Sequence, residues 1–314
     1  MFDDIIGQWD LKRSAEVAVV AARRRGEPLG HCLVSGSGGL GKTYFLSSLC
    51  HELDYCYFST QGSRLTRSKV SQFLTENTQK ASNAGKIAFL VIDEIHEMSE
   101  DSQEELYFPM DKSTILTLGE PTKLPPFCLA GATTDPQQLD GKSLINRFSH
   151  HWRMEAMSSY DLLFIVNEYL TKEGIPSQLP VLSTIAERAR GIPRLALKYA
   201  ARARDFAQYH GHKEILLSDL NETFSDLGID TLGLDEIQRK YLTILYNSDK
   251  PVGKEALSNM LDMHPDQVSR MVEPYLWKLG FLTSSSRGRE LTDKGFKHLA
   301  GGGYFSEFDK NMQD

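Results

Sequence analysis

The chain has 314 residues, of which 40% are hydrophobic and 25% are charged, and its formal net charge is -7. That length is enough for two or three domains with proper cores, and the composition is ordinary for a globular protein. No apolar run is long enough to span a bilayer and the first residues lack a signal-peptide core, so we expect a cytoplasmic protein. The four cysteines lack metal-ligand spacing, and the negative charge confines any nucleic-acid contact to a local basic surface.

Three short apolar runs organise the first half of the chain. They are HCLVSG at 31–36, KIAFLVIDE at 86–94 and FCLAGATT at 127–134, and each ends in glycine, acidic residues or threonine. Continuous apolar runs of this length are typical of parallel strands that are buried on both faces. Helical patterns lie between them, so residues 1–155 predict an α/β nucleotide-binding domain with a parallel sheet.

The second half of the chain predicts two further domains. Residues 156–230 carry apolar residues at helical spacing with no strand signal, which predicts a small helical domain. Residues 231–302 predict three helices, the last two joined by a tight turn at 262–265, followed by a β-hairpin at 281–293. This order is the plan of a winged helix, a DNA-binding domain. We expect residues 303–314 to form a flexible tail.

The segment GSGGLGKT, from Gly36 to Thr43, matches the phosphate-binding pattern G-x-x-x-x-G-K-[ST] in full. It lies between a predicted strand and a predicted helix, where backbone N–H groups and the helix N-terminus can bind an anion. Lys42 should reach the β- and γ-phosphates of ATP, and Thr43 should bind Mg²⁺. The predicted nucleotide-binding residues of this loop are Gly36, Gly38, Gly39, Leu40, Gly41, Lys42 and Thr43.

Two carboxylates, Asp93 and Glu94, follow the second predicted strand. Ligands of open α/β sheets bind at the carboxyl ends of strands, so this pair should face the phosphate loop. Asp93 can hold Mg²⁺ through water, and Glu94 can polarise the water that attacks the γ-phosphate. Glu94 therefore favours hydrolysis of ATP over binding alone.

A series of motifs in one order carries a family resemblance. IDEIH at 92–96, GATT at 131–134, Asn146-Arg147-Phe148 and RARGIPR at 188–194 follow the phosphate loop as they do in AAA+ ATPases. The chain specifically resembles the RuvB family of Holliday-junction branch-migration motors, from about residue 2 to residue 300. The resemblance implies an AAA+ P-loop domain, a helical lid and a C-terminal winged helix.

The resemblance also implies roles for residues around the ATP. Arg147 resembles the arginine finger, which reaches the ATP of a neighbouring subunit and makes hydrolysis depend on assembly. Thr133 resembles the sensor of the γ-phosphate, with Thr134 as the alternative. The residues that would contact the adenine and phosphates from the N-terminal segment and the lid are Ile6, Gly7, Pro193 and Arg194.

Candidate DNA contacts lie in two basic segments. Arg287 and Arg289 alternate around a glycine on the predicted wing, as phosphate-tracking residues would, although a solvated wing is the alternative. Arg64, Arg67 and Lys69 lie in a segment that faces the central path of the ring in the family. A merely charged helix start explains those three residues as well.

One stretch departs from the family pattern. Between Met110 and Pro126 the chain is shorter than the family, whose long apolar-tipped hairpin in this place docks onto RuvA. This change disfavours a RuvA-like partner without excluding one, and it leaves another mobile-element or recombination protein as the alternative. Asp135 also replaces the basic residue that follows GATT in the family.

Two functions fit these observations. The first is an ATP-driven motor that assembles as a hexameric ring and moves double-stranded or branched DNA during recombination and repair. The alternative is a DNA-binding AAA+ switch that assembles with ATP and recruits a transposase, nuclease or replication protein. A scaffold without ATPase activity is disfavoured because Lys42, Asp93, Glu94 and Arg147 are all present.

Overall fold

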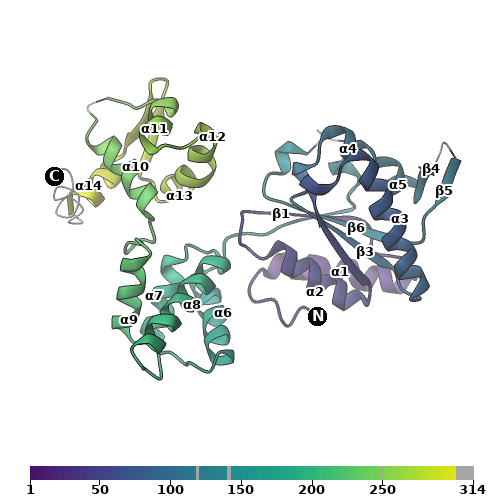
Figure 1. The fold of residues 1–314 in the computed structure, drawn as a ribbon, viewed down its shortest axis with the longest axis horizontal. Helices are drawn as coiled ribbons and strands as arrows, with labels where there is room; N and C mark the ends of the chain where they lie inside the picture. The colour runs from purple at the N-terminus through teal and green to yellow at the C-terminus, as the bar shows by residue number, and fades with distance from the viewer. Residues whose placement is uncertain (118–119, 140–142, 249, 302–314) are drawn as a thin grey trace. The chain divides into compact units, whose positions relative to one another are not determined.

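A computed structural model describes residues 1–117, 120–139, 143–248 and 250–301 of the chain. The predicted tail at 303–314 lies outside the described residues. The chain divides into two compact units, Met1–Leu217 and Ser218–Asp314, which are treated separately below (Figure 1).

A five-stranded parallel sheet forms the centre of the first unit. The prediction of a parallel α/β domain is therefore confirmed. Its strands, in spatial order, are β2 (Cys56–Gln61), β3 (Ala88–Asp93), β6 (Phe127–Thr133), β1 (Cys32–Ser35) and β7 (His150–Arg153). The predicted strands at 31–36, 86–94 and 127–134 occupy the three central positions, whereas β2 and β7 were not predicted.

Helices cover both faces of this sheet (Figure 1). Because side chains alternate along a strand, Phe89 and Val91 pack with α1 and α2, whereas Leu90 and Ile92 pack with α3 and α5. The helices of this domain are α1 (Trp9–Arg25), α2 (Lys42–Leu53), α3 (Arg67–Asn83), α4 (Glu100–Glu104) and α5 (Tyr107–Lys112). Four short 3-10 turns complete the domain: η1 (Gly62–Arg64), η2 (Ile95–Glu97), η3 (Pro136–Gln138) and η4 (Ile145–Arg147).

A short antiparallel hairpin follows α5. Its strands are β4 (Thr114–Thr117) and β5 (Glu120–Lys123), paired from Thr114 with Lys123 to Thr117 with Glu120. Residues 118–119, between them, lie outside the described part of the chain. This hairpin occupies the stretch that the sequence singled out as shorter than in the family.

The helical region of the first unit contains α6 (Ser159–Lys172), α7 (Leu179–Arg188) and α8 (Pro193–Tyr209). Ser158 caps α6 by accepting a hydrogen bond from the backbone of Asp161. The buried face of α8 consists largely of alanines, including Ala196, Ala200 and Ala203. Small side chains allow α6 and α7 to approach α8 closely.

The second unit contains the predicted winged helix. Its first helix, α9 (Leu217–Asp226), begins at the last residue of the first unit and lies in the region predicted as the helical lid. The helices of the winged helix are α10 (Glu236–Tyr246), α11 (Lys254–Leu261), α12 (Pro265–Gln267), α13 (Glu273–Lys278) and α14 (Asp293–Gly301). The wing consists of β8 (Leu282–Ser285) and β9 (Gly288–Leu291), and Arg289 also pairs with Val252 through backbone hydrogen bonds. The final helix α14 was not predicted.

The helix before the wing contains a π-helical segment from Val268 to Val272, between α12 and α13. Pro274 lies just beyond it, in the first turn of α13. Proline lacks an N–H and its ring clashes with the carbonyl four residues earlier, so the wider π turn removes that clash. The proline therefore explains why this helix is not regular throughout.

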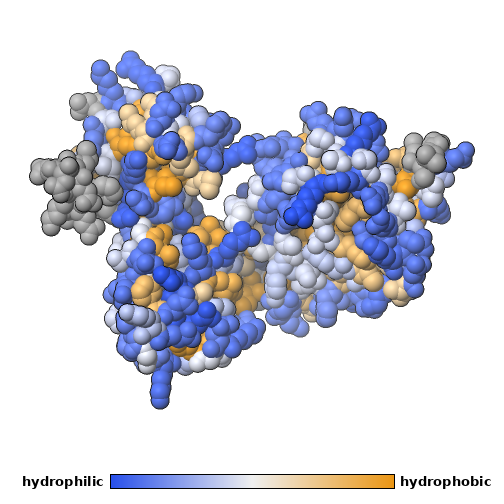
Figure 2. Space-filling view, viewed as in Figure 1, coloured by the Kyte–Doolittle hydropathy of each residue, from blue (hydrophilic) through white to orange (hydrophobic). Residues whose placement is uncertain are grey.

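Both units expose mainly hydrophilic side chains on the face drawn in Figure 2, with apolar residues gathered in smaller patches. Among the described residues, none of the helices is both long enough and apolar enough to cross a membrane. Exposed apolar residues of α6 and α7 include Phe164 and Leu179.

Candidate nucleotide-binding site

The phosphate loop runs from the end of β1 into α2, as the sequence predicts. Gly36, Gly39 and Gly41 have φ angles of 150°, 80° and 98°, which side-chain-bearing residues rarely adopt. A Cβ atom at Gly36 would lie 2.6 Å from the carbonyl oxygen of Met154. The glycines therefore permit a tight loop whose backbone N–H groups can surround phosphate oxygens.

Lys42 is the first residue of α2 and its side chain folds back over the loop. Its Nζ atom donates hydrogen bonds to the carbonyl oxygens of Gly36, at 2.8 Å, and Ser37, at 3.2 Å. Burial lowers the pKa of Lys42, whereas the nearby carboxylates of Glu94 and Asp93 raise it. The ammonium group is thus placed between the loop and the acidic pair, where phosphate oxygens of a bound nucleotide would accept its protons.

Asp93 lies at the end of β3, next to the phosphate loop. Its Oδ2 atom accepts hydrogen bonds from Thr43 Oγ1 and from Gln61 Nε2, both at 3.4 Å. Parallel pairing of β2 with β3 sets Gln61 directly opposite Asp93. Hydroxyl and carboxylate oxygens that converge in this way are the ligands that Mg²⁺ prefers.

Glu94 adopts a left-handed backbone conformation, with φ 46° and ψ 53°. Its Oε2 atom accepts hydrogen bonds from the backbone N–H of Thr134, at 3.0 Å, and from the Thr134 hydroxyl, at 2.9 Å. His96 Nδ1 lies 3.3 Å from the same oxygen. A non-glycine residue in this region is strained, and such strain is often found at functional sites.

Thr133, the last residue of β6, and Thr134, which follows it, differ in environment. Thr133 is fully buried, and its hydroxyl contacts His96 Nδ1 and accepts a hydrogen bond from the backbone of Asp135, both at 3.0 Å. Thr134 is exposed and bound to Glu94. The sensor role of Thr133, with Thr134 as the alternative, stays a prediction, and Thr134 is the more accessible of the two.

The helical region contacts the phosphate loop through Arg194. The backbone N–H of Arg194 donates to the carbonyl of Gly39 at 3.2 Å, directly after Pro193, which begins α8. A Cβ atom at Gly39 would lie 2.9 Å from Ile192 and 3.0 Å from Arg194. The absence of a side chain at Gly39 therefore allows this region to close onto the loop.

The N-terminal segment meets the start of the helical region. A Cβ atom at Gly7 would lie 3.0 Å from the Asp161 carboxylate, and Gly7 has a φ of 67°. The side chain of Gln8 pairs with the main chain of Glu155, donating at 2.7 Å and accepting at 3.2 Å. A pocket of about 290 Å³ begins beside this pair, with lining residues that include Met157 and Asp161. The lining of this pocket begins at Gln8 and includes neither Ile6 nor Gly7, whose contact with the adenine stays a prediction.

Arg147 ends the turn η4 and contacts α5. Its Nε donates to Asp111 Oδ2 at 3.1 Å, and its Nη1 donates to the Ser143 carbonyl at 2.6 Å. The guanidinium carbon lies 4.1 Å from the centre of the Tyr107 ring. Neither Asp111 nor Tyr107 was identified from the sequence.

The comparisons with known proteins agree with this geometry. Three family models match: the RuvB P-loop domain over residues 1–154, the RuvB AAA lid domain over 164–230 and the RuvB C-terminal winged helix domain over 231–300. The chain belongs to the RuvB family. It is an AAA+ ATPase by that membership and by its P-loop.

Relatives match over almost the full length of the chain. It is 34% identical to the Holliday junction branch migration complex subunit RuvB of Wolbachia sp. subsp. Brugia malayi, over 95% of this chain and 92% of that one. It is 33% identical to the RuvB subunit of Fervidobacterium nodosum, covering 97% and 90%. The solved Thermotoga maritima RuvB, a Holliday junction branch migration motor, matches with a TM-score of 0.83 at 31% identity, covering 95% and 96%.

The basic residues on the wing of this RuvB-family chain differ from each other. Arg287 is exposed at the turn between β8 and β9. Arg289 instead pairs with Glu273, through Nε at 2.9 Å and Nη2 at 3.5 Å, and Tyr241 donates to the same carboxylate at 2.9 Å. Both arginines stay predicted DNA contacts, and Arg289 in addition has an internal partner.

The second basic segment runs from η1 into α3. Arg64 and Lys69 are exposed, whereas Arg67 forms a surface ion pair with Glu105 at 2.6 Å. Surface pairs of this kind contribute little to stability and exchange readily with solvent. All three residues stay predicted DNA contacts.

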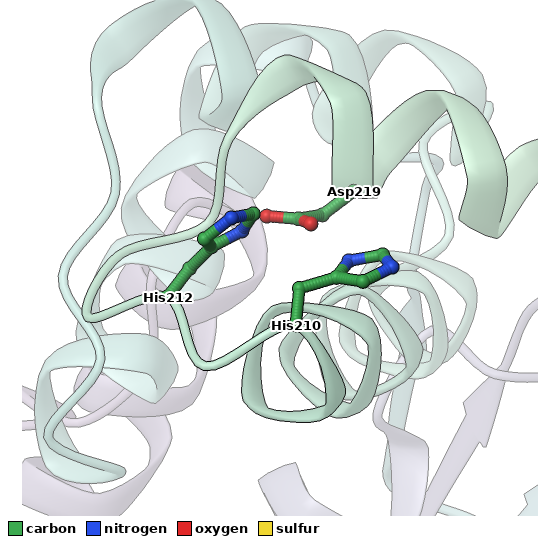
Figure 3. A group of neighbouring side chains, drawn as sticks. All are labelled: His210, His212 and Asp219. Carbon is green, nitrogen blue, oxygen red and sulfur yellow. The ribbon is translucent and has the colours of Figure 1, made fainter.

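A group of potential metal ligands lies away from the phosphate loop. Figure 3 shows His210, His212 and Asp219, whose ligand atoms all lie within 4.8 Å of one another. All three residues also take part in other interactions. The group therefore fits a structural polar network as well as a cation site, and we assign it no function.

Proposed function

We propose that this chain is an ATP-driven motor that hydrolyses ATP at the interfaces of a hexameric ring and thereby moves branched or duplex DNA. The observation that carries the proposal is the convergence of Lys42, Thr43, Asp93 and Glu94 at the carboxyl end of the sheet. The winged helix adds a domain type that binds DNA. The relatives named above are branch-migration subunits, which suggests the same kind of DNA substrate here.

The residues present fit ATP with Mg²⁺. Thr43 Oγ1 and Asp93 Oδ2 lie 3.4 Å apart and offer two oxygen ligands beside the phosphate loop. Lys42 Nζ now donates to loop carbonyls, and phosphate oxygens would be stronger acceptors for the same protons. Mg²⁺, when bound, neutralises charge on the β- and γ-phosphates.

Within this site Glu94 would orient the attacking water and accept its proton. Two hydrogen bonds from Thr134 hold one carboxylate oxygen, which limits the rotation of the side chain. A base that is held in this way is already oriented when the substrate binds. Thr134 would in addition sense the γ-phosphate, because it is exposed next to Glu94.

Arg147 would act in trans, on the ATP of a neighbouring subunit. A positive charge delivered to the γ-phosphate stabilises the transition state and is worth about 10³- to 10⁵-fold in turnover. Arg194 and Pro193 would close the lid over the nucleotide of their own subunit, since Arg194 contacts Gly39 of its loop and Pro193 directly precedes it.

The partner protein is expected to differ from RuvA. The hairpin β4–β5 has strands of only four residues each, and the residues of β5 are all exposed and mostly polar. The described residues of β5 therefore offer a small, mostly polar surface, unlike the long apolar-tipped hairpin that the resemblance implies for the family.

A branch-migration assay tests the motor function directly. A labelled four-way junction should be converted to products by the protein with ATP and Mg²⁺, and not by a Glu94→Gln variant. Electron microscopy with an ATP analogue and the same DNA should show rings with DNA in the pore. The proposal fails if DNA binds in an ATP-dependent way and yet no junction or duplex is ever remodelled.

That outcome would support the second candidate, an AAA+ switch that assembles on DNA and recruits another protein. The short polar hairpin is the observation that favours it, because a changed docking element suggests a changed partner. Filaments in place of rings would point the same way.

A further inference from the structure

The contacts of Arg147 come from several directions at once. Asp111 accepts from Nε at 3.1 Å, the Ser143 carbonyl accepts from Nη1 at 2.6 Å, and the Tyr107 ring lies against the guanidinium at 4.1 Å. An arginine on a surface would ordinarily sample many rotamers, because its side chain carries about 2 kcal/mol of conformational entropy. These contacts restrict it to one orientation.

The two hydrogen bonds leave part of the guanidinium unused. A guanidinium has more N–H donors than these bonds occupy, and no hydrogen bond from Nη2 is found among the described residues. The Nε of Arg147 points to Asp111 of its own subunit, and the Arg147 side chain is 26% exposed. The terminal edge is thus the part that can donate to an anion, and bidentate donation from this edge suits phosphate.

Asp111 itself is held by the structure around α5. Met110, its neighbour, accepts a hydrogen bond from His31 Nε2 at 3.3 Å, and His31 Nδ1 accepts from the backbone of Leu129 in β6 at 2.9 Å. The helix that carries Asp111 is therefore anchored to a central strand. Tyr107, one turn earlier on α5, supplies the ring.

We propose that Asp111 is a positioning residue for hydrolysis, which orients the guanidinium of Arg147 toward the ATP of the neighbouring subunit. The inference rests on the proposed function, in which Arg147 acts in trans. In this proposal Asp111 acts through its ion pair with Arg147. Its side chain is 44% exposed, so the ion pair contributes little to folding, and its loss should appear in turnover.

The first test is a comparison of variants at this position. Asp111→Ala should lower kcat about 10- to 100-fold with little change in KM, because the finger is disordered but the nucleotide site of the same subunit is intact. Asp111→Asn should retain more activity, since the amide oxygen can still accept from Nε. Thermal unfolding should be unchanged in both, and Asp101→Ala, at an exposed acid in α4, is the matched control.

The decisive test mixes subunits. Glu94→Gln inactivates a nucleotide site but keeps the finger, whereas Asp111→Ala keeps the site and weakens the finger. A mixture should therefore be more active than the sum of the separate proteins, because some interfaces combine a good site with a good finger. An Arg147→Ala and Glu94→Gln mixture should show the same recovery.

The outcomes separate two failures. If the Arg147→Ala mixture recovers and the Asp111→Ala mixture does not, or if Asp111→Ala turns over normally, the positioning role is overturned while the finger stands. If Arg147→Ala alone hydrolyses ATP at the normal rate, or its mixture does not recover, the finger assignment and the positioning role both fall.

Discussion

The phosphate-loop region and the wing both contain charged residues that the sequence marks as functional, yet the structure treats them differently. Around the loop, the charged side chains lie close together: burial lowers the pKa of Lys42, and the carboxylates of Glu94 and Asp93 are near enough to raise it. Each is also held by a hydrogen bond, Lys42 to Gly36, Asp93 from Thr43 and Glu94 from Thr134. On the wing, Arg289 is paired internally with Glu273, and Arg287 stays exposed. The phosphate-loop motif therefore predicts where its side chains lie in the folded chain, because phosphate binding fixes their spacing. A cluster of basic residues does not, because each arginine in it can instead form an ion pair within the domain.

The largest expected effect is at the loop region, for Glu94→Gln. Loss of the general base should lower ATP hydrolysis about 10²- to 10⁴-fold, while nucleotide affinity stays close to that of the unmodified protein. Glu97→Gln is the matched control, because Glu97 is exposed two residues beyond the buried Ile95. Steady-state hydrolysis and nucleotide-binding titrations measure both quantities. Equal turnover in the two variants would remove Glu94 from the catalytic site.

The next effect belongs to the wing. Arg289→Met leaves the Glu273 carboxylate, which is 5% exposed, without its cationic partner. Breaking a buried pair costs about 3–5 kcal/mol, and partial exposure of Arg289 reduces this to about 2–4 kcal/mol. Hydrogen exchange should quicken in α10 and α13, with the sheet of the first unit as internal reference.

Arg287→Met is the counterpart on the same wing. Because Arg287 is exposed, its loss should leave hydrogen exchange unchanged but weaken DNA binding and flatten its salt dependence. If Arg287→Met destabilises the winged helix, or Arg289→Met leaves exchange unchanged, the contrast between the two arginines is wrong.

A smaller loss of ATP hydrolysis is expected for Gly62→Ala, which disturbs the backbone next to the phosphate loop. A Cβ atom at Gly62 would lie 2.3 Å from the carbonyl oxygen of Glu94, so Gly62→Ala must displace that residue. A shift of this kind should lower kcat about 10- to 100-fold with KM little changed. Gly253→Ala is the control, because a Cβ atom there would meet nothing within 4 Å. Normal kcat in Gly62→Ala would show that the Glu94 backbone adjusts without loss.

The sequence predicts the central strands, the phosphate loop and the winged helix because each has a local pattern. Apolar runs mark β1, β3 and β6, whereas the edge strand β2 alternates between half-buried and exposed residues and β7 contains two histidines, so neither stands out. The pairing of Arg289 with Glu273 joins residues from different elements, and no spacing rule identifies it. The same holds for Asp111, which meets Arg147 only after the chain has folded.

The choice between Thr133 and Thr134 shows that the sequence does not predict which of two adjacent residues is accessible. Thr133 ends β6, which is buried along its whole length, whereas Thr134 follows the strand and is exposed. The resemblance put Thr133 first and Thr134 second as the sensor, and the contact of Thr133 with His96 and of Thr134 with Glu94 appears only in the folded chain.

The smallest effect concerns pH and the anchor of α5. Burial lowers the pKa of His31, whose Nδ1 accepts from the Leu129 backbone and must be unprotonated to do so. The unfolded chain therefore gains this proton first as the pH falls below about 6.5, so stability declines there by at most about 1.4 kcal/mol per pH unit. His31→Gln should flatten that part of the stability profile and leave it unchanged above pH 7, as urea unfolding of both proteins would show. Because His31 anchors the helix that carries Asp111, protonation should also weaken the hold on Arg147, and an equally steep profile in His31→Gln would place the acid sensitivity elsewhere.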